Sequence, residues 1–265
     1  MKENLKTAIQ ASLKAGKVIM EVYNSVIEVE YKDDKSPLTE ADKRANAIIN
    51  SYLIPTKIPI ISEENKQTNY DERRNWKTCW VVDPVDGTKE FIKRNGEFTV
   101  NIALVKNEKP VLGIIYVPAI KTIYLADVEN QIALKSEIGS HDANLEEVLE
   151  NAKKLQPKDS NSKLIQVVGS RSHMSLETLD FMESLKSEGK DVEIVSKGSS
   201  LKFCLVAEGN ADVYPRYAPT MEWDTAAGQA ICNAVGIDVI SKETNKPLLY
   251  NKENLLNPWF LVSKA

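Results

Sequence analysis

Histidine and cysteine are scarce in this 265-residue chain. The two histidines, His141 and His173, are too few for the zinc and Ser-His-Asp chemistries that depend on imidazole groups. The three cysteines, Cys79, Cys204 and Cys232, are odd in number and have no CxxC spacing, which argues against a disulfide framework and a thiolate zinc site. We expect them to be small buried residues. Any catalysis should therefore depend on carboxylates.

Long apolar runs and basic runs are also absent. The longest apolar stretches, such as Val111–Val117, fall far short of the roughly 20 residues that a membrane-spanning helix needs. The N-terminal segment Met1–Tyr23 lacks the compact apolar block of a signal peptide, so we expect a cytoplasmic protein. The 34 Lys and Arg residues against 38 Asp and Glu residues give a formal charge of -4, which argues against a nucleic-acid partner.

The apolar pattern of the first half predicts two helices followed by strands. Leu5 to Tyr23 has helical spacing, and Thr39 is the expected N-cap of a second helix in which Asp42 stands three residues further on. Later segments are rich in β-branched and aromatic residues. The predicted strands are Ile58–Ile61, Trp80–Val82, Phe98–Val105, Val111–Val117 and Thr122–Ala126. The apolar run Val111–Val117 indicates a sheet that is covered on both faces.

The second half predicts alternating strands and helices. Asn130–Ser162 is polar and predicts an irregular connection with a subdomain boundary. Beyond it we expect strands at Leu164–Val168, Val192–Val195, Ala211–Tyr214 and Ile237–Ile240, with helices around Leu176–Leu185, Ser200–Ala207 and Thr225–Val235. The chain is thus expected to have an α+β half (residues 1–150) and an α/β half (residues 151–265) that form one catalytic unit.

One strand end carries two acids into a tight turn, in the stretch Trp80–Thr88. Asp, Pro and Gly are turn residues, so a simple β-turn is one interpretation. The other is a site for a hard cation such as Mg²⁺, formed by the Asp83 and Asp86 carboxylates and the Val85 carbonyl. Gly87 and Thr88 would then offer their amides, and Thr88 its hydroxyl, to a phosphate.

Three further acids have a structural and a functional interpretation. Glu63 ends another apolar strand and could lie in a solvated turn. Asp42 could be the capping-box acid of its helix, and Asp224 could be an N-cap. Each pattern is weak by itself. Several carboxylates that meet in one place would need cations, since two of them 4 Å apart repel by roughly 4 kcal/mol at an effective dielectric constant near 20.

The order and local sequence of these acids are similar to those of one family. The blocks Thr39–Asp42, Ser62–Glu64, Asp83–Thr88 and Trp223–Gly228 resemble the inositol monophosphatase superfamily of Mg²⁺-dependent, lithium-sensitive phosphatases. The resemblance spans nearly the whole chain. Further blocks resemble the bacterial bisphosphate nucleotidases of that superfamily: Asp86–Phe91, Ser170–His173, Gly198–Gly209, Tyr214–Arg216 and Leu256–Pro258.

The resemblance implies an α+β fold, the layered αβαβα sandwich of the inositol monophosphatase and fructose-1,6-bisphosphatase type. It implies two Mg²⁺ ions and leaves room for a third. Glu63, Asp83 and the Val85 carbonyl would hold one ion, and Asp83, Asp86 and Asp224 the other. Asp42 and Thr88, with Glu63 beside them, would activate the attacking water.

The implied reaction is hydrolysis of the 3′-phosphate of adenosine 3′,5′-bisphosphate to AMP and phosphate, with a role in sulfur assimilation and nucleotide recycling. The implied substrate contacts are Glu63, Val85, Asp86, Gly87, Thr88, Ser199, Ser200, Lys202, Arg216 and Asp224. A structural alternative for Ser199–Lys202 is an N-cap serine followed by a solvent-facing lysine. His173 could be structural or a ligand contact.

Two other functions remain open from the sequence. One is an inositol monophosphatase or broader sugar-phosphate phosphatase, and the other is a non-catalytic sensor of adenosine bisphosphate. Neither a monomer nor a homodimer is excluded. The resemblance also leaves open peripheral association with the cytoplasmic face of the inner membrane, although the chain has no transmembrane segment and no obvious anchor.

Overall fold

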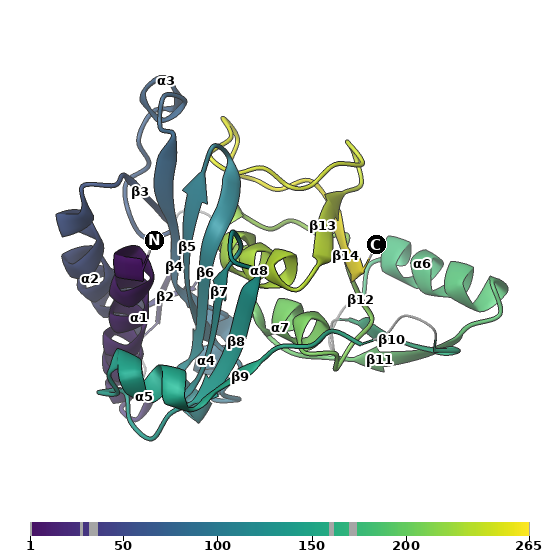
Figure 1. Ribbon diagram of the computed structural model, residues 1–265, viewed down its shortest axis with the longest axis horizontal. Helices are drawn as coiled ribbons and strands as arrows, with labels where there is room; N and C mark the ends of the chain where they lie inside the picture. The colour runs from purple at the N-terminus through teal and green to yellow at the C-terminus, as the bar shows by residue number, and fades with distance from the viewer. Residues whose placement is uncertain (1, 27–28, 32–36, 159–161, 170–173, 265) are drawn as a thin grey trace.

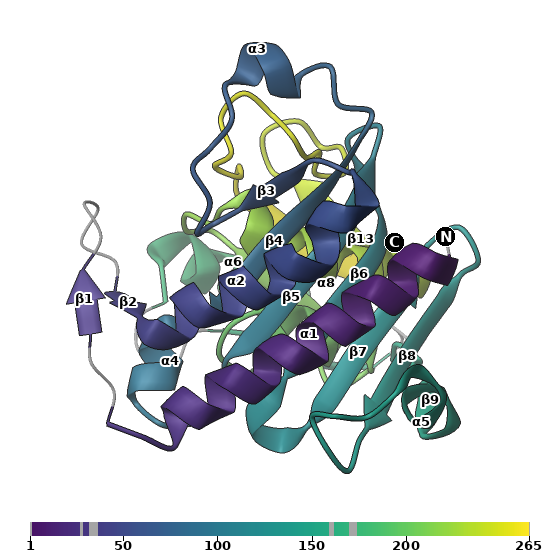
Figure 2. The same cartoon turned by 90° about the vertical axis from the view of Figure 1, so that its left-hand side faces the viewer.

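The fold has five layers, α, β, α, β and α, in which two sheets enclose a central pair of helices (Figure 1). The computed structural model describes residues 2–26, 29–31, 37–158, 162–169 and 174–264. Helices α1 (Lys2–Tyr23) and α2 (Glu40–Leu53) pack side by side on the outer face of the first sheet (Figure 2). The layered α+β architecture expected from the sequence is confirmed, as are both of these helices and the Thr39 N-cap.

The first sheet has seven strands in the order β3-β4-β5-β6-β7-β8-β9. Strand β3 is parallel to β4, and all the other neighbours are antiparallel. Alternate residues of the central strands enter two cores. Trp80, Val82 and Ile102 pack under α1 and α2, whereas Val81 and Ala103 belong to the core that contains α7 and α8. The apolar runs therefore reflect a sheet that is covered on both faces, as predicted. The strands are β3 (Ile60–Ser62), β4 (Thr78–Asp86), β5 (Thr99–Lys106), β6 (Lys109–Val117), β7 (Thr122–Asp127), β8 (Ile132–Glu137) and β9 (Ala152–Lys154).

The segment Asn130–Ser162 is more regular than its composition predicts. It contains β8, β9 and helix α5 (Leu145–Glu150), and the two strands extend the first sheet as far as Lys154. The prediction of an irregular connection over the whole segment was wrong because β8 and β9 lie at the sheet edge. Except for Ile132, their exposed positions carry charged side chains, Glu137, Lys153 and Lys154, so their composition resembles that of a loop.

The second sheet has five strands in the order β11-β10-β12-β14-β13. Strand β10 is parallel to β11 and β12, whereas β14 is antiparallel to β12 and β13. The sheet is thus mixed, and the sequence pattern did not predict β14. Its strands are β10 (Leu164–Val168), β11 (Asp191–Val195), β12 (Val213–Arg216), β13 (Ile237–Ser241) and β14 (Phe260–Lys264). The helices of this half are α6 (Leu176–Ser187), α7 (Leu201–Ala207) and α8 (Glu222–Ala234).

Helix α8 lies between the two sheets (Figure 1). Two glycines allow this close packing. A Cβ atom on Gly113 of β6 would lie 2.5 Å from the Ala227 carbonyl oxygen, and one on Gly228 would lie 2.4 Å from the Phe203 ring. Because α8 contacts β4, β5 and β6, its first turn is held near the end of β4.

The remaining elements are short. They are strands β1 (Val29–Tyr31) and β2 (Pro37–Thr39), helices α3 (Tyr70–Arg73) and α4 (Thr88–Ile92), and 3-10 turns η1 (Ile54–Thr56) and η2 (Pro118–Ile120). The three cysteines are buried, as expected. In the described part of the chain, every helix is too short or too polar to cross a membrane.

Candidate metal and phosphate site

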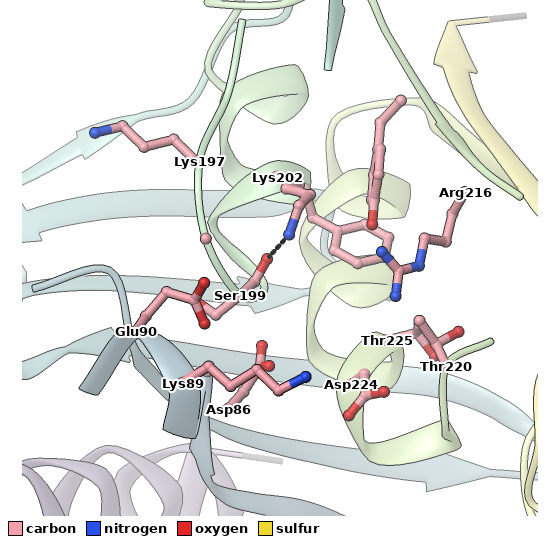
Figure 3. A pocket seen from close by; sticks show the side chains of 14 residues that line it. Asp86, Lys89, Glu90, Lys197, Ser199, Lys202, Arg216, Thr220, Asp224 and Thr225 are labelled. Carbon is pink, nitrogen blue, oxygen red and sulfur yellow. Dashed lines mark hydrogen bonds between the residues drawn. The ribbon is translucent and has the colours of Figure 1, made fainter. Parts of the chain in front are cut away.

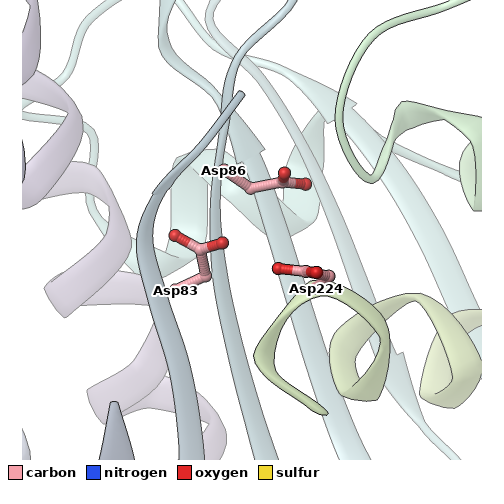
Figure 4. A group of neighbouring side chains, drawn as sticks. All are labelled: Asp83, Asp86 and Asp224. Atoms are coloured by element: carbon pink, nitrogen blue, oxygen red, sulfur yellow. The ribbon is translucent and has the colours of Figure 1, made fainter. Parts of the chain in front are cut away.

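Three carboxylates from the two halves of the chain converge at one place (Figure 4). Asp83 and Asp86 stand at the end of β4, and Asp224 lies in the first turn of α8. One oxygen from each lies within 4.8 Å of the others. The β4–β5 register shifts between Asp83 and Asp86, which is an irregularity of the kind that redirects side chains at functional strand ends.

Burial and mutual repulsion raise the pKa values of these acids. Asp83 is 1% exposed, and its pKa is raised well above the ordinary range by burial and then by the charges of Glu63, Asp86, Asp224 and Asp42. Burial, followed by the charge of Asp86, raises the pKa of Asp224 to about 7. Such a cluster is unfavourable when ionised unless cations neutralise it. Carboxylate oxygens are the donors that Mg²⁺ prefers, so the residues present fit this ion.

Glu63 lies beside this triplet but is not a member of it. It follows β3, which pairs in parallel with β4, and its amide donates to the Val82 carbonyl oxygen at 3.2 Å. The carboxylate is near enough to be the second-largest cause of the raised Asp83 pKa. Parallel pairing of β3 with β4 therefore places two strand-end acids next to each other.

Asp42 combines the two interpretations that its sequence left open. It accepts hydrogen bonds at Oδ2 from the Thr39 amide (2.7 Å) and hydroxyl (2.6 Å), which makes it the capping-box acid of α2. Its Oδ1 lies 3.4 Å from the Thr88 hydroxyl, which is also 3.3 Å from the Val85 carbonyl oxygen. One face of this buried carboxylate thus stabilises a helix while the other faces the end of β4.

Asp224 is not an N-cap, which corrects the structural alternative proposed from the sequence. Helix α8 begins at Glu222, three residues before the expected first helical residue Thr225, with Met221 as the N-cap residue. Asp224 Oδ2 accepts a hydrogen bond from the Met221 amide at 2.8 Å. The sequence pattern misplaced the first residue of α8 because an apolar methionine occupies the N-cap position, where Ser, Thr, Asp or Asn is expected.

A cavity of about 350 Å³ opens beside Asp86 and Asp224 (Figure 3). Its other wall carries Ser199, Lys202 and Arg216, and burial lowers the pKa of Lys202. The Lys202 ammonium donates to the Ser199 carbonyl oxygen at 3.1 Å, so the solvent-facing alternative for this lysine was wrong. Asp86 and Asp224 therefore share one cavity with Lys202 and Arg216, and Lys89 lies beside the acids (Figure 3).

The structure brings Gly87, Ser199, Lys202 and Arg216 to this cavity as the sequence predicted, but it places the Ser200 side chain elsewhere. Ser200 is 1% exposed, and its hydroxyl lies 2.6 Å from Asp86 Oδ2. The sequence analysis assigned no site role to several polar residues near the acids. They are Lys89, Glu90, Thr99, Asn101, Tyr214 and Thr220. The appearance of Thr99 and Asn101 within an apolar strand was a signal that could have drawn attention to them. The block Ser170–His173 lies outside the described residues.

Comparison with known proteins identifies the class. The family model described as "Inositol monophosphatase family" matches residues 1–259. The chain therefore belongs to the inositol monophosphatase family. Solved structures with lower identity support the fold, among them the extragenic suppressor protein suhB of Bartonella henselae, with a TM-score of 0.72 at 21% identity over 97% of this chain and 92% of that one.

More similar relatives carry one particular name. The 3′(2′),5′-bisphosphate nucleotidase CysQ of Salmonella typhimurium is 44% identical over 98% of this chain and 99% of its own length. CysQ of Haemophilus influenzae is 33% identical over 97% of this chain and 91% of its own length. The crystal structure of CysQ from Bacteroides thetaiotaomicron is 48% identical, covers 100% of this chain and 98% of its own, and has a TM-score of 0.88. The resemblance stated from the motifs is confirmed.

Proposed function

We propose that this protein is an Mg²⁺-dependent 3′(2′),5′-bisphosphate nucleotidase, which hydrolyses adenosine 3′,5′-bisphosphate to AMP and phosphate. The observation that carries the proposal is the cavity that Asp86 and Asp224 line next to the buried Asp83, with Lys202 and Arg216 on its other wall. A nucleoside bisphosphate has two phosphates that match these two walls. The full-length similarity to CysQ proteins supports the same substrate.

The acidic residues would hold two Mg²⁺ ions, with room for a third. Asp83 would contact both, together with Glu63 and the Val85 carbonyl for one ion and Asp86 and Asp224 for the other. When bound, these ions supply Lewis acidity toward the phosphoryl oxygens and lower the pKa of a nearby water. The raised pKa values of Asp83 and Asp224 agree with such a role, because a cation would remove the repulsion that raises them.

Asp42 and Thr88 would receive the proton of the attacking water. The Thr88 hydroxyl can donate to Asp42 Oδ1, 3.4 Å away, and its oxygen can then accept from the water. The two hydrogen bonds at Asp42 Oδ2 hold this carboxyl group so that Oδ1 faces Thr88. As the water oxygen bonds to phosphorus, the bond to the 3′-oxygen breaks and that oxygen is protonated by solvent. Glu63 would lie beside this water.

The basic wall of the cavity would hold the second phosphate. Lys202 and Arg216 supply charge, and Ser199 lies next to Lys202 on the cavity wall (Figure 3). The Gly87 and Thr88 amides offer donors to the phosphate that is cleaved. A role in sulfur assimilation and nucleotide recycling would follow from this substrate.

A substrate panel tests the proposal. The purified protein with Mg²⁺ should release phosphate from adenosine 3′,5′-bisphosphate far faster than from inositol 1-phosphate or fructose 1,6-bisphosphate, with AMP as the nucleotide product by chromatography. Li⁺ and Ca²⁺ should inhibit. Faster release from inositol 1-phosphate would point to a monophosphatase instead. Tight binding of the bisphosphate in calorimetry without AMP formation would identify a sensor.

A further inference from the structure

A buried polar network surrounds Asp86 and comes from both halves of the chain. Thr99 and Asn101 lie on β5 of the first sheet, and Ser200 lies directly before α7 in the second half. The exposed fractions of these three residues are 0%, 1% and 1%. None of the three lines the cavity beside Asp86, so their buried polar atoms must find their partners among neighbouring protein groups.

The hydrogen-bond geometry is directed at one oxygen of Asp86. Oδ2 lies 2.6 Å from the Ser200 hydroxyl, 3.3 Å from the Asn101 amide nitrogen and 3.5 Å from the Thr99 hydroxyl. The Ser200 contact is short, as expected for a hydroxyl that donates to a carboxylate. Protein donors therefore fix the orientation of this carboxyl group.

Asn101 in turn fixes Ser200. Its amide nitrogen donates to the Ser200 hydroxyl oxygen at 2.7 Å, while its side-chain oxygen accepts from Thr99 at 3.0 Å. Since the Ser200 oxygen accepts from Asn101, its hydrogen is left to point to Asp86 Oδ2, which is nearer than the Asp224 carbonyl oxygen at 3.0 Å. The chain of donors runs from β5 through Ser200 to Asp86.

We infer that Ser200 and Asn101 are positioning residues that orient Asp86 for cation binding, rather than contacts of the substrate. The inference rests on the proposed function, in which Asp86 is a metal ligand. A carboxylate that is already held in one orientation has little rotational freedom left to lose when it binds a cation. Donors to a ligating carboxylate are typically worth 10–100-fold in metal affinity. This assignment gives the buried Ser200 a role that its expected substrate contact does not explain.

The test is Mg²⁺ binding by isothermal titration calorimetry on the full chain, with Mn²⁺ binding by electron paramagnetic resonance as a second probe. Ser200→Ala should weaken binding by roughly 10–100-fold. Ser200→Thr keeps the hydroxyl and should restore most of the affinity. The matched control is Ser241→Ala. Ser241 is 2% exposed and accepts hydrogen bonds from two backbone amides in a turn, but it belongs to neither the cavity nor the acid cluster.

The outcomes separate the two proposals. If the unchanged protein binds neither ion, the metal site of the proposed function fails, and the positioning role fails with it. If the unchanged protein binds and folded Ser200→Ala binds within about twofold of it, the positioning role alone is overturned. Should Ser200→Ala not fold, Asn101→Leu takes its place. That variant keeps the branched side-chain shape and removes the donor to Ser200, so unaltered metal affinity in it would equally overturn the inference.

Discussion

Asp83 is the residue at which burial and charge conflict most directly. It is almost fully buried, and four other carboxylates raise its pKa. We predict that Asp83→Asn lowers kcat by at least roughly 10³-fold, about 4 kcal/mol in activation free energy, because the carboxylate proposed to contact both cations is lost. The same change should raise the melting temperature of the cation-free protein, because a repelled buried charge is removed. Phosphate release and thermal unfolding in a chelator measure these effects.

The control for this substitution is Asp127→Asn. Asp127 is also buried, at 8% exposure, but its carboxylate bonds to the backbone amide and side chain of Asn130, at the end of β7. The substitution Asp127→Asn should leave kcat unchanged. An Asp83→Asn protein that is folded and fully active would contradict the metal site.

Lys202 provides the second prediction at the residue scale. Its ammonium is half-buried in the cavity, where one carbonyl oxygen accepts from it. Lys202→Gln should raise KM for adenosine 3′,5′-bisphosphate by about 10–100-fold, since a hydrogen bond to a charged group is worth about 1.5–3 kcal/mol. For 3′-AMP, which has no 5′-phosphate, KM should change little. Steady-state kinetics with both substrates make this comparison.

Lys158→Gln is the matched control for Lys202→Gln. Lys158 is partly buried and pairs with Asp212 at 3.1 Å, and it does not line the cavity beside Asp86. A Lys202→Gln protein with equal rises in KM for both nucleotides would assign the lysine to the cleaved phosphate instead of the second one.

Residue-level prediction from sequence depended on local motifs. Asp83 and Asp86 were found because they stand three residues apart in one local motif at the end of β4, and Asp224 because its block matches the family. Ser200 was assigned to the substrate because its neighbours Ser199 and Lys202 face the cavity. The direction of the Ser200 hydroxyl depends on Asn101, about one hundred residues earlier. A sequence pattern within one segment does not show a contact between residues so far apart in the chain.

At the scale of elements, the position of Asp224 depends on how closely α8 approaches the first sheet. Gly113→Ala should destabilise the protein by about 1–3 kcal/mol, because the new methyl group would lie 2.5 Å from the Ala227 carbonyl oxygen, on rigid helix backbone. The helix would have to move away from β6. Urea unfolding measures the free-energy change, and metal titration shows whether Asp224 moves with the helix.

Gly139→Ala is the control for Gly113→Ala. The nearest atom to its added Cβ would be the Glu147 carboxylate oxygen at an ordinary 3.7 Å. It should change the free energy of unfolding by less than about 0.5 kcal/mol. Equal stability of the two variants would show that the α8 contact tolerates an added methyl group.

The elements that were predicted well are those with strong periodicity. Helices α1 and α2 and the buried strands β4 to β7 each bury a continuous face, and their patterns showed it. Strand β14 was missed although it lies inside the second sheet. It follows β13 with no helix between them, and it pairs antiparallel with β12 and β13. The alternation of strands and helices expected for this half therefore did not predict it.

At the scale of the whole molecule, the site exists only where the two halves meet. Asp83 and Asp86 come from the first sheet, Asp224 from α8, and Lys202 from α7. The sequence predicted this meeting through family resemblance, because no local pattern relates residues 83 and 224. The division into halves at residue 150 stays a prediction. In the structure the sheet pairing changes between Lys154 and Leu164.

The chain has a formal charge of -4, and its buried acids should make the stability of the whole molecule depend on pH. Burial and the charge of Asp86 raise the pKa of Asp224 from an ordinary value of 3.8 to about 7, and the pKa of Asp83 is raised as well. The folded state thus holds these protons more tightly than the unfolded state does. The resulting stabilisation is fully present below the unfolded pKa and is lost as the pH rises through the folded pKa. Without cations, the protein should be less stable at about pH 8 than at about pH 5.5.

Mg²⁺ should act in the opposite sense, because it binds the ionised carboxylates and must compete with protons at low pH. At about one hundred times its dissociation constant, a ligand stabilises the folded state by about 2.7 kcal/mol, or roughly 5–10 °C in a chain of this size. We expect an upward shift of this order at about pH 8 and a much smaller one at about pH 5.5, measured by differential scanning calorimetry with and without Mg²⁺. His141 and other distant groups titrate equally in both samples, so their effects cancel in the difference. Asp224→Asn should remove much of the pH dependence of the shift. An equal Mg²⁺ shift at both pH values in the unchanged protein would show that the cation does not compete with protons at these carboxylates.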